Sequence, residues 1–427
     1  MQPTLAKAVT SAVCAVAVAV IGAGCTSASP RPSASAGTST VSASPAGTVS
    51  ATEFPLPARS LPAPACATAT APSAVLTGVR TAMVSVPGSP FGVAAAPGGG
   101  WAFAAVCGGV EVLRAGRSLA PAALRTIPVA GSPAGLAITP DGRYLLAADG
   151  SGAAVISVAR AEQGTAGAVL GTLSAPGRGA LDDSAIEAAV SPDGQFAFVT
   201  LEYADRAAVF NLGEALRTGF GAADYAGSVP LGQAAVGLAV SPDGRWLYAT
   251  SEAVQSPQGP AGQHGTLTVI GLRRAETDPA LSVVATVDAG CQPVRVITSA
   301  DGGEVWVTAR GSDDLLCFSA ASLLSDPARA LVAVVRVGEA PVGLAAVHGG
   351  SLVVVADSNR FGASGAAADL DVVNTAAALS RGRAVVGHIP SGLFPREMAL
   401  LPDGTLLVSN YASSQVEAVD VASIPTG

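Results

Sequence analysis

The chain has 427 residues, a formal net charge of −8 and 49% hydrophobic residues, and only 13% of its residues are charged. The acidic balance excludes nucleic acid as an expected partner, because phosphate binding needs a basic surface. The length suits two ordinary domains or one large repeat fold, and the apolar content can supply a sizeable core.

Residues 1–24 have the composition of a secretory signal peptide. Lys7 precedes an Ala/Val-rich run that ends in small residues at Gly24. The run is short and weakly apolar for a membrane span, so we interpret it as a processing segment.

The sequence VIGAGCTSAS around Cys25 resembles a bacterial lipoprotein signal. The resemblance implies that Cys25 receives a lipid after cleavage, which would place the protein outside the cytoplasm, attached to the membrane by its lipid alone. Gly22 stands where that signal usually has Leu, and an ordinary signal peptide remains the alternative. Residues 25–73 follow as a Ser/Thr/Ala/Pro-rich stretch with few bulky apolar residues, which predicts a disordered tether.

From residue 74 onward one unit repeats about every 50 residues. The hairpin sequence SPDGRWLYAT (241–250) recurs in related forms, and Pro, Asp and Gly each suit a tight turn. The turn marker falls at Pro97, Pro140, Pro192, Pro242, Ala300, His348 and Pro402. Seven residues before each marker stands a second punctuation residue: Pro90, Pro133, Ala185, Ala235, Pro293, Pro341 and Pro395.

The segments on both sides of the turn read as strands. The strand after the turn is apolar on both faces, as Trp246 and Tyr248 illustrate, which favours a sheet stacked between two others. Two more strands complete each unit, for example residues 153–158 and 168–173. Four strands in 40–50 residues, repeated seven times, predict an all-β, seven-bladed β-propeller over residues 74–427.

The strand-like sequence at residues 81–90 precedes the first unit, and the last unit has only three strands, ending at residues 415–421. We therefore expect the N-terminal strand to complete the last blade and to close the ring. The repeat also resembles the YVTN-repeat propellers over about residues 75–425, although Ser251 replaces the family's Asn in the fourth unit.

Four cysteines follow the signal: Cys66, Cys107, Cys291 and Cys317. An even number in an exported protein permits two disulfides with three possible connectivities, and the sequence does not choose among them. The absence of a CxxC pair argues against a metal or redox motif.

The first strand of each unit begins at an equivalent position that is Gly in four units and charged in three. The charged residues are Glu187, Arg295 and Glu397, with Arg396 beside the last. They are expected at one rim of the central channel, either as a ligand site or as an ion pair in solvent. Further candidate contacts on loops of the same face are Tyr203, Arg310, Asp357, Asn359, Arg360, Asn410 and Tyr411.

Three functions fit this sequence. The first is a monomeric, non-enzymatic propeller that binds a small molecule or an envelope protein; the others are a lactonase-like hydrolase using rim carboxylates and a structural envelope protein. Propeller lactonases for phosphogluconate resemble this fold but carry a His-rich rim. Here His348 falls in a turn on the opposite face, His388 in an outer strand, and His264 in a long loop without an evident partner. No metal site, cofactor or catalytic residue is predicted, because Arg295 would oppose a cation between the two glutamates.

Overall fold

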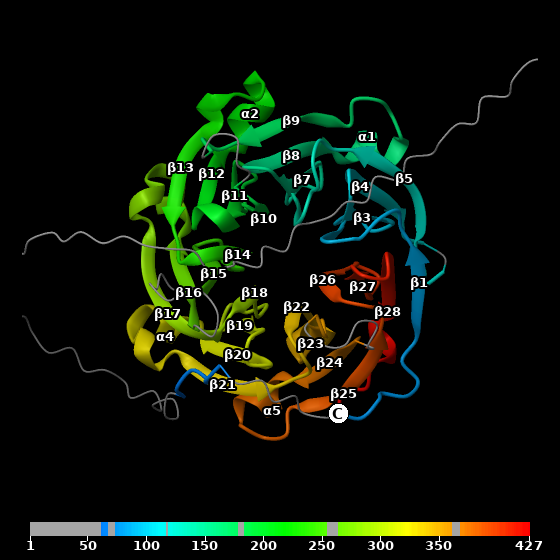
Figure 1. The fold of residues 1–427 in the computed structure, drawn as a ribbon, viewed down its shortest axis with the longest axis vertical. Coiled ribbons are helices and arrows are strands. Elements are labelled where there is room, and N and C mark those ends of the chain that lie inside the picture. Colours follow the sequence, from blue (N-terminus) through cyan, green and yellow to red (C-terminus); the bar gives the residue numbers. More distant parts are fainter. Residues whose placement is uncertain (1–60, 67–72, 117, 178–182, 254–263, 361–367) are drawn as a thin grey trace, which may run out of the picture. The chain divides into compact units, whose positions relative to one another are not determined.

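The computed structural model describes residues 61–66, 73–116, 118–177, 183–253, 264–360 and 368–427. Within these ranges it shows seven four-stranded antiparallel sheets arranged in a ring (Figure 1). The prediction of a seven-bladed β-propeller is therefore confirmed.

Each blade runs outward from the centre of the ring in four strands. The innermost strands are β2 (Val93–Ala95), β6 (Leu136–Ile138), β10 (Ala185–Val190), β14 (Gln233–Val240), β18 (Pro293–Thr298), β22 (Pro341–Val347) and β26 (Pro395–Leu400). The second strands are β3 (Trp101–Val106), β7 (Tyr144–Asp149), β11 (Phe196–Leu201), β15 (Trp246–Ala253), β19 (Glu304–Ala309), β23 (Leu352–Asp357) and β27 (Thr405–Asn410).

The third strands are β4 (Gly109–Arg114), β8 (Gly152–Ser157), β12 (Arg206–Asn211), β16 (His264–Gly271), β20 (Asp314–Ser319), β24 (Ala368–Asn374) and β28 (Gln415–Asp420). The outer strands are β5 (Ala122–Pro128), β9 (Val169–Ser174), β13 (Tyr225–Pro230), β17 (Val283–Cys291), β21 (Leu331–Arg336), β25 (Val385–Ser391) and β1 (Thr81–Ser85).

The core lies between the blades. Each pair of neighbouring blades shares one cluster of buried apolar side chains; Phe103 of the first blade, for example, packs with Leu145 and Ile156 of the second. The second strands are buried on both faces, as their apolar sequence predicted. Burial of this apolar surface is the main stabilising contribution to the ring.

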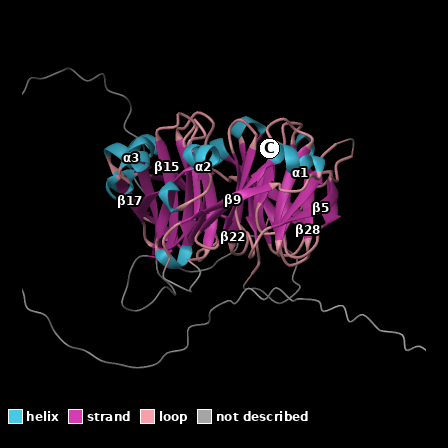
Figure 2. Ribbon diagram, turned by 90° about the horizontal axis from the view of Figure 1, so that it is seen from above, coloured by secondary structure: helices cyan, strands magenta, loops and turns pink. Residues whose placement is uncertain are grey.

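The short helices gather mainly at one end of the ring, where the hairpins between first and second strands also lie (Figure 2). We call this the turn end. The α-helices follow third strands: α1 (Val158–Gln163), α2 (Leu212–Thr218), α3 (Leu272–Thr277), α4 (Ala320–Ser325) and α5 (Thr375–Leu379). The described 3₁₀ turns are η1 (Glu202–Ala204), η2 (Ala222–Asp224), η3 (Pro279–Leu281), η4 (Pro327–Arg329), η5 (His348–Gly350) and η6 (Val421–Ser423).

Buried hydroxyl groups of the second strands hold neighbouring blades together near the axis. Thr308 Oγ1 accepts a hydrogen bond from the backbone N–H of Arg295 at 3.1 Å and donates to the carbonyl of Val342, in the next blade, at 2.7 Å. Thr250 Oγ1 donates to the Val294 carbonyl at 2.7 Å. The Thr of the repeat is thus an inter-blade link, since it satisfies a backbone carbonyl that would otherwise be buried without a partner.

The ring closes through β1, as expected. β1 pairs antiparallel with β28, with Thr81 opposite Val419 and Ser85 opposite Gln415. Ser409 Oγ in the same blade donates to the Phe91 carbonyl at 2.6 Å, which joins the last blade to the first. The closing blade therefore combines both ends of the propeller sequence, and β1 gives its third strand, β28, a partner on both sides.

The described part of the expected tether does not behave as predicted. The Leu61 N–H donates to the Leu331 carbonyl at 3.2 Å, and Cys66 forms a disulfide with Cys291. Ser73 Oγ donates to Asp371 at 2.8 Å. The prediction of disorder is wrong for residues 61–66 because Leu61 packs into an apolar cluster and the disulfide fixes the segment. Among the residues described, no helix is long and apolar enough to cross a membrane.

Candidate functional site

The end opposite the turns, where each innermost strand begins, carries the candidate site; we call it the entry end. In five blades a non-glycine residue with left-handed backbone stands directly before that strand or, in β14, at its second residue, and a register irregularity follows it. These residues are Ser184, Ala234, Gln292, Ala340 and Phe394, with φ between 51° and 56°. Residues other than glycine rarely adopt this backbone conformation, so contacts with the surrounding structure must hold the backbone in it.

The equivalent position two residues into each innermost segment shows why four blades have Gly. A Cβ atom at Gly92 would lie 2.5 Å from the Ala134 carbonyl oxygen, and one at Gly135 would lie 2.5 Å from the Ile186 carbonyl oxygen. Neighbouring blades therefore touch backbone to backbone at this level. The three charged residues occupy this same ring of positions.

The structure brings Glu187, Arg295 and Glu397 together. Arg295 Nε lies 3.3 Å from Glu187 Oε2 and also donates to Glu397 Oε1, while Nη1 donates to the Val236 carbonyl at 3.3 Å. The three side chains are only 6%, 13% and 14% exposed. The interpretation of a solvent-exposed ion pair is therefore wrong: the contact forms, but it is buried.

Burial also sets the protonation of this group. Removal from water, together with the negative charge of Glu397, raises the pKa of Glu187 to about 8. Burial disfavours the charge of Arg295, but the two carboxylates outweigh it and raise its pKa. Arg295 Nη2 is buried without a hydrogen-bond partner. At neutral pH the burial and the neighbouring carboxyl group therefore favour the protonated form of Glu187, while Arg295 stays charged.

Arg396 lies beside this group and is held by aromatic rings. Its guanidinium carbon is 3.7 Å from the ring centre of Phe91, 4.9 Å from that of Phe394 and 5.6 Å from that of Tyr411. Tyr411 contacts both phenylalanines edge-on, with ring centres 6.4 and 5.5 Å apart. Such cation–π contacts fix the orientation of a guanidinium without neutralising it.

The positive charge of Arg396 has no acidic counterpart within ion-pairing distance among the described residues. Its Nε is buried without a hydrogen-bond partner. Burial, together with the nearby charge of Arg295, lowers the pKa of Arg396 to about 9. An anion placed against this guanidinium would accept a hydrogen bond from it and would stabilise its positive charge.

Further charged side chains surround Arg396 on the same end. Arg310 Nη2 donates to Glu252 Oε2 at 2.7 Å, and both side chains are largely buried. The Arg360 guanidinium carbon lies 5.4 Å from the Phe394 ring centre, and burial and Arg310 lower its pKa. Burial and the charge of Glu252 raise the pKa of Glu202. We call the three arginines 310, 360 and 396, with their carboxylate and aromatic neighbours, the entry cluster.

Other predicted contacts lie elsewhere. Asp357 is 1% exposed and accepts the Asp371 N–H at 3.3 Å, so it acts inside the sixth blade. Asn410 is fully buried and donates to Glu417 at 3.2 Å. Tyr203 is 55% exposed in η1, and the N–H of Asn359 donates to the Glu339 carbonyl at 3.0 Å. These four do not contact the buried ion pair.

Sequence reasoning missed Phe91 and Phe394, which hold Arg396. The only signal was their position next to Pro90 and Pro395, the punctuation before the first strand. It also treated His264 as unpartnered, which is wrong: Nδ1 lies 2.7 Å from Asp288 Oδ2. The predicted lipidation site, Cys25, lies outside the described residues.

Of the three disulfide connectivities left open, the structure contains the Cys66–Cys291 bond, while Cys317 is a buried free thiol. Cys107 is also disulfide-bonded, but to none of these three cysteines, so a second bond within the four-cysteine set is not formed. No sequence spacing pointed to this pair, since the two cysteines are 225 residues apart.

A family model described as "Lactonase, 7-bladed beta-propeller" matches residues 108–361, more than half of the chain. The chain belongs to the seven-bladed β-propeller lactonase family. This lactonase-family propeller has no match among curated proteins. Among solved structures, it is similar to the Kuenenia stuttgartiensis Hydrazine Synthase, with 16% identity and a TM-score of 0.58 over 80% of this chain and 98% of that one. At that identity the likeness shows the fold alone.

Proposed function

We propose that this lactonase-family propeller is an extracytoplasmic binding module that takes an anionic ligand at its entry end, through Arg396. The observation that supports this is an arginine fixed by three aromatic rings and lacking a carboxylate partner among the described residues. A carboxylate or phosphate would accept charge-assisted hydrogen bonds from it. Arg360, partly covered and on the same ring of Phe394, provides a second cation.

The neighbouring groups keep this site positive. Glu397 is engaged by Arg295, and Glu252 is engaged by Arg310. Glu187 is largely protonated at neutral pH because its pKa is raised to about 8. Few carboxylates thus remain to compete with an anionic ligand for Arg396.

Isothermal titration calorimetry tests the proposal. The probes are gluconate and citrate as hydroxy acids, glucose 6-phosphate as a phosphate, and glucose as an uncharged control. We expect the anions but not glucose to bind, and Arg396→Gln to weaken binding about ten- to hundredfold, because a hydrogen bond to a charged group contributes about 1.5–3 kcal/mol. Arg273→Gln, an exposed position in α3 at the turn end, is the matched control.

Two results would contradict the proposal. One is equal binding of glucose and gluconate; the other is equal loss of affinity in Arg396→Gln and Arg273→Gln. Melting temperatures of both variants are measured in parallel, so that unfolding is not mistaken for lost binding.

A lactone hydrolase is the second candidate, and the raised pKa of Glu187 favours it. A carboxyl group protonated at neutral pH can act as a general acid, and such groups gather at catalytic sites. Direct contact with Arg295 instead favours a fixed, structural pair. Hydrolysis of δ-gluconolactone releases acid, and a pH-stat measures its rate against the spontaneous reaction. This measurement separates the hydrolase from the structural ion pair. Turnover that is lost in Glu187→Gln while gluconate still binds would establish the hydrolase.

The membrane anchor completes the proposed function. We propose that a lipid on Cys25 holds the propeller at the membrane surface, because VIGAGCTSAS has the composition of a lipoprotein signal. Cys25→Ser should release the protein from membranes. If that variant still sediments with membranes in high salt, the lipid anchor is refuted.

A further inference from the structure

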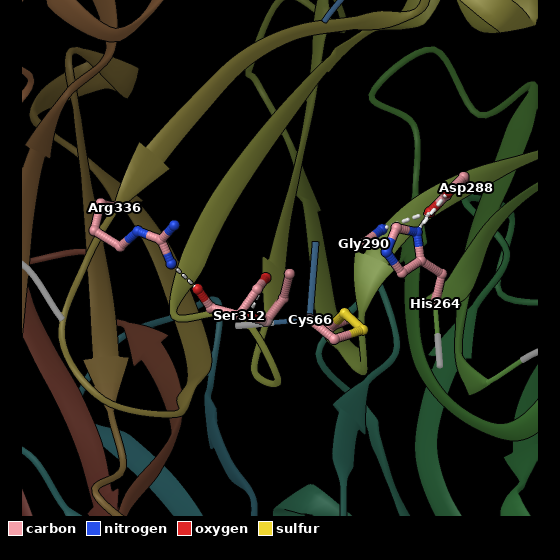
Figure 3. The surroundings of a disulfide bond; sticks show 8 residues. Cys66, His264, Asp288, Gly290, Ser312 and Arg336 are labelled. Atoms are coloured by element: carbon pink, nitrogen blue, oxygen red, sulfur yellow. Dashed lines mark hydrogen bonds and ion pairs between the residues drawn. A yellow bond between two sulfur atoms is a disulfide. The ribbon is translucent and has the colours of Figure 1, made fainter. Parts of the chain in front are cut away.

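The disulfide Cys66–Cys291 lies next to a histidine whose orientation is fixed. Cys291 is the last residue of β17 and pairs across the sheet with His264, the first residue of β16. Cys66 reaches the same point from the N-terminal segment, with its Cα 5.3 Å from that of Cys291. The two sulfur atoms and a ring nitrogen of His264 all lie within 4.8 Å of one another. Figure 3 shows the histidine ring beside the disulfide.

An acidic residue orients this histidine. His264 Nδ1 lies 2.8 and 2.7 Å from the two carboxylate oxygens of Asp288, and the Gly290 N–H donates to Asp288 Oδ1 at 2.9 Å. The hydrogen bond occupies Nδ1, so Nε2 carries the lone pair. A carboxylate behind a histidine in this way is the usual support of a metal-binding imidazole, because it fixes the tautomer and increases the basicity of the ligand nitrogen.

We propose that reduction of Cys66–Cys291 converts this group into a binding site for Zn²⁺ or a similar divalent transition metal, with Cys66, Cys291 and His264 as ligands. A dithiol or phosphine reductant supplies two electrons; the S–S bond breaks and two protons make the two thiols, while the reductant is oxidised. The metal then displaces both protons and binds two thiolates and Nε2. Water takes the fourth position.

The present geometry needs little change to reach that state. Ligand atoms of a tetrahedral zinc site are about 3.5–3.8 Å apart, given bonds of about 2.0–2.3 Å. The sulfur atoms must separate to that distance after reduction, and one ring nitrogen of His264 is already within 4.8 Å of both. Figure 3 also shows Arg336, whose guanidinium points to the Ser312 carbonyl instead of the disulfide.

The entry cluster, as defined above, does not have this donor set. The carboxylates there contact arginines, whereas thiolate and imidazole are the ligands that zinc prefers. The site would join the N-terminal segment to the fourth blade in the reduced protein, as the disulfide does in the oxidised one. The inference does not depend on the anion site at Arg396.

Cobalt(II) provides the direct test, because thiolate ligands give it a characteristic charge-transfer band. The full chain is reduced with tris(2-carboxyethyl)phosphine without oxygen and titrated with Co²⁺, then with Zn²⁺ in competition. We expect a thiolate–cobalt band that saturates at one equivalent and is displaced by Zn²⁺. The oxidised chain should give no such band, since a disulfide has no thiolate to offer.

Variants locate the site. Cys66→Ser should remove the band, and His264→Ala should weaken cobalt binding at least about tenfold. Asp288→Asn should weaken it about 10–100-fold, the usual effect of losing the carboxylate behind a histidine ligand. Cys317→Ser, which changes the buried free thiol, is the matched control and should bind as the unmodified chain does.

His264→Ala leaves the disulfide cysteines intact, so circular dichroism of its oxidised form checks that the variant still folds. Three outcomes overturn the proposal: no thiolate–cobalt band in the reduced chain, equal cobalt affinity in the His264→Ala variant and the unmodified chain, or a band that persists undiminished in Cys66→Ser.

Discussion

At the turn end, the hairpin carboxylates are exposed and fully engaged. Asp243 accepts hydrogen bonds from Ser241 Oγ at 2.6 Å and from the Arg245 N–H at 3.1 Å, and these bonds lower its pKa. Asp301 repeats the pattern with Ser299, with the same effect on its pKa. At the entry end, burial moves the pKa of Glu187 the other way, to about 8.

This contrast separates the turn end, where the repeat fixes the same hydrogen bonds in several blades, from the entry end, where the residues differ between blades. The turn network recurs with the same atoms in several blades, and each copy stabilises the charged form of its aspartate. At the entry end the repeated Gly gives way to Glu187, Arg295 and Glu397 in three blades, and the ionised groups are crowded and partly unsatisfied. Where burial makes an ionised side chain unfavourable, a bound ligand of opposite charge can change the free energy of that side chain most.

The largest expected change in stability comes from removing the buried cation Arg295 at the entry end. Arg295→Met should destabilise the protein by about 3–5 kcal/mol, because it leaves the buried Glu397 carboxylate without its counter-charge, next to the protonated Glu187. An exposed rim pair would be worth only about 0–1 kcal/mol. Urea unfolding followed by circular dichroism measures the difference.

A compensated variant serves as the control for Arg295→Met. Adding Glu187→Gln and Glu397→Gln removes the uncompensated charge and should recover most of the lost stability. A loss below about 1 kcal/mol in the single variant would show that this end of the ring is solvated like the other.

The two ends should also respond to pH in different windows. Glu187 binds a proton in the folded state but not in the unfolded state between about pH 4.5 and 8. Its contribution to stability is therefore fully present below about pH 4.5 and is lost as the pH rises through about 8. Unfolding measured from pH 5 to 9 should show this decline, and Glu187→Gln should flatten it. An identical slope in the variant would contradict the assignment.

An intermediate effect is expected between the two ends, at the inter-blade links. Thr308→Val keeps the side-chain shape but leaves the Arg295 N–H and the Val342 carbonyl without their shared partner. Burying such groups unsatisfied costs about 1–3 kcal/mol. Thr277→Val, at an exposed position in α3, is the control and should change stability little. Equal losses in the two variants would show that the buried hydroxyl contributes nothing special.

The sequence predicted this architecture because its determinants are local. The Pro–Asp–Gly turn and the doubly apolar strand are both set within about ten residues, and repetition supplied the number of blades. The same repeat placed Glu187, Arg295 and Glu397 at equivalent positions, from which their convergence could be expected.

What escaped sequence reasoning depends on distant contacts. The burial of Arg295 follows from packing by neighbouring blades, and the rings around Arg396 come from the first and last blades. The Cys66–Cys291 bond joins segments 225 residues apart. None of these contacts has a periodic signal in the sequence. The location of the site could therefore be predicted, but its burial and its aromatic neighbours could not.

The smallest effect is expected at a single turn. Asp243→Ala removes the acceptor of two hydrogen bonds at an exposed hairpin, so the expected loss is about 1 kcal/mol. Asp243→Asn keeps an oxygen at the same place and should lose less.

Because the folded pKa of Asp243 is lowered, its stabilising contribution is present above about pH 3.8 and is lost as the pH falls through the folded pKa. Acid unfolding below pH 4 should therefore be shallower in Asp243→Asn than in the unmodified chain, while the decline from pH 5 to 9 stays the same. If Asp243→Asn instead altered the upper window, the two ends would be electrostatically coupled, and the separation between a structural end and a ligand-binding end would fail.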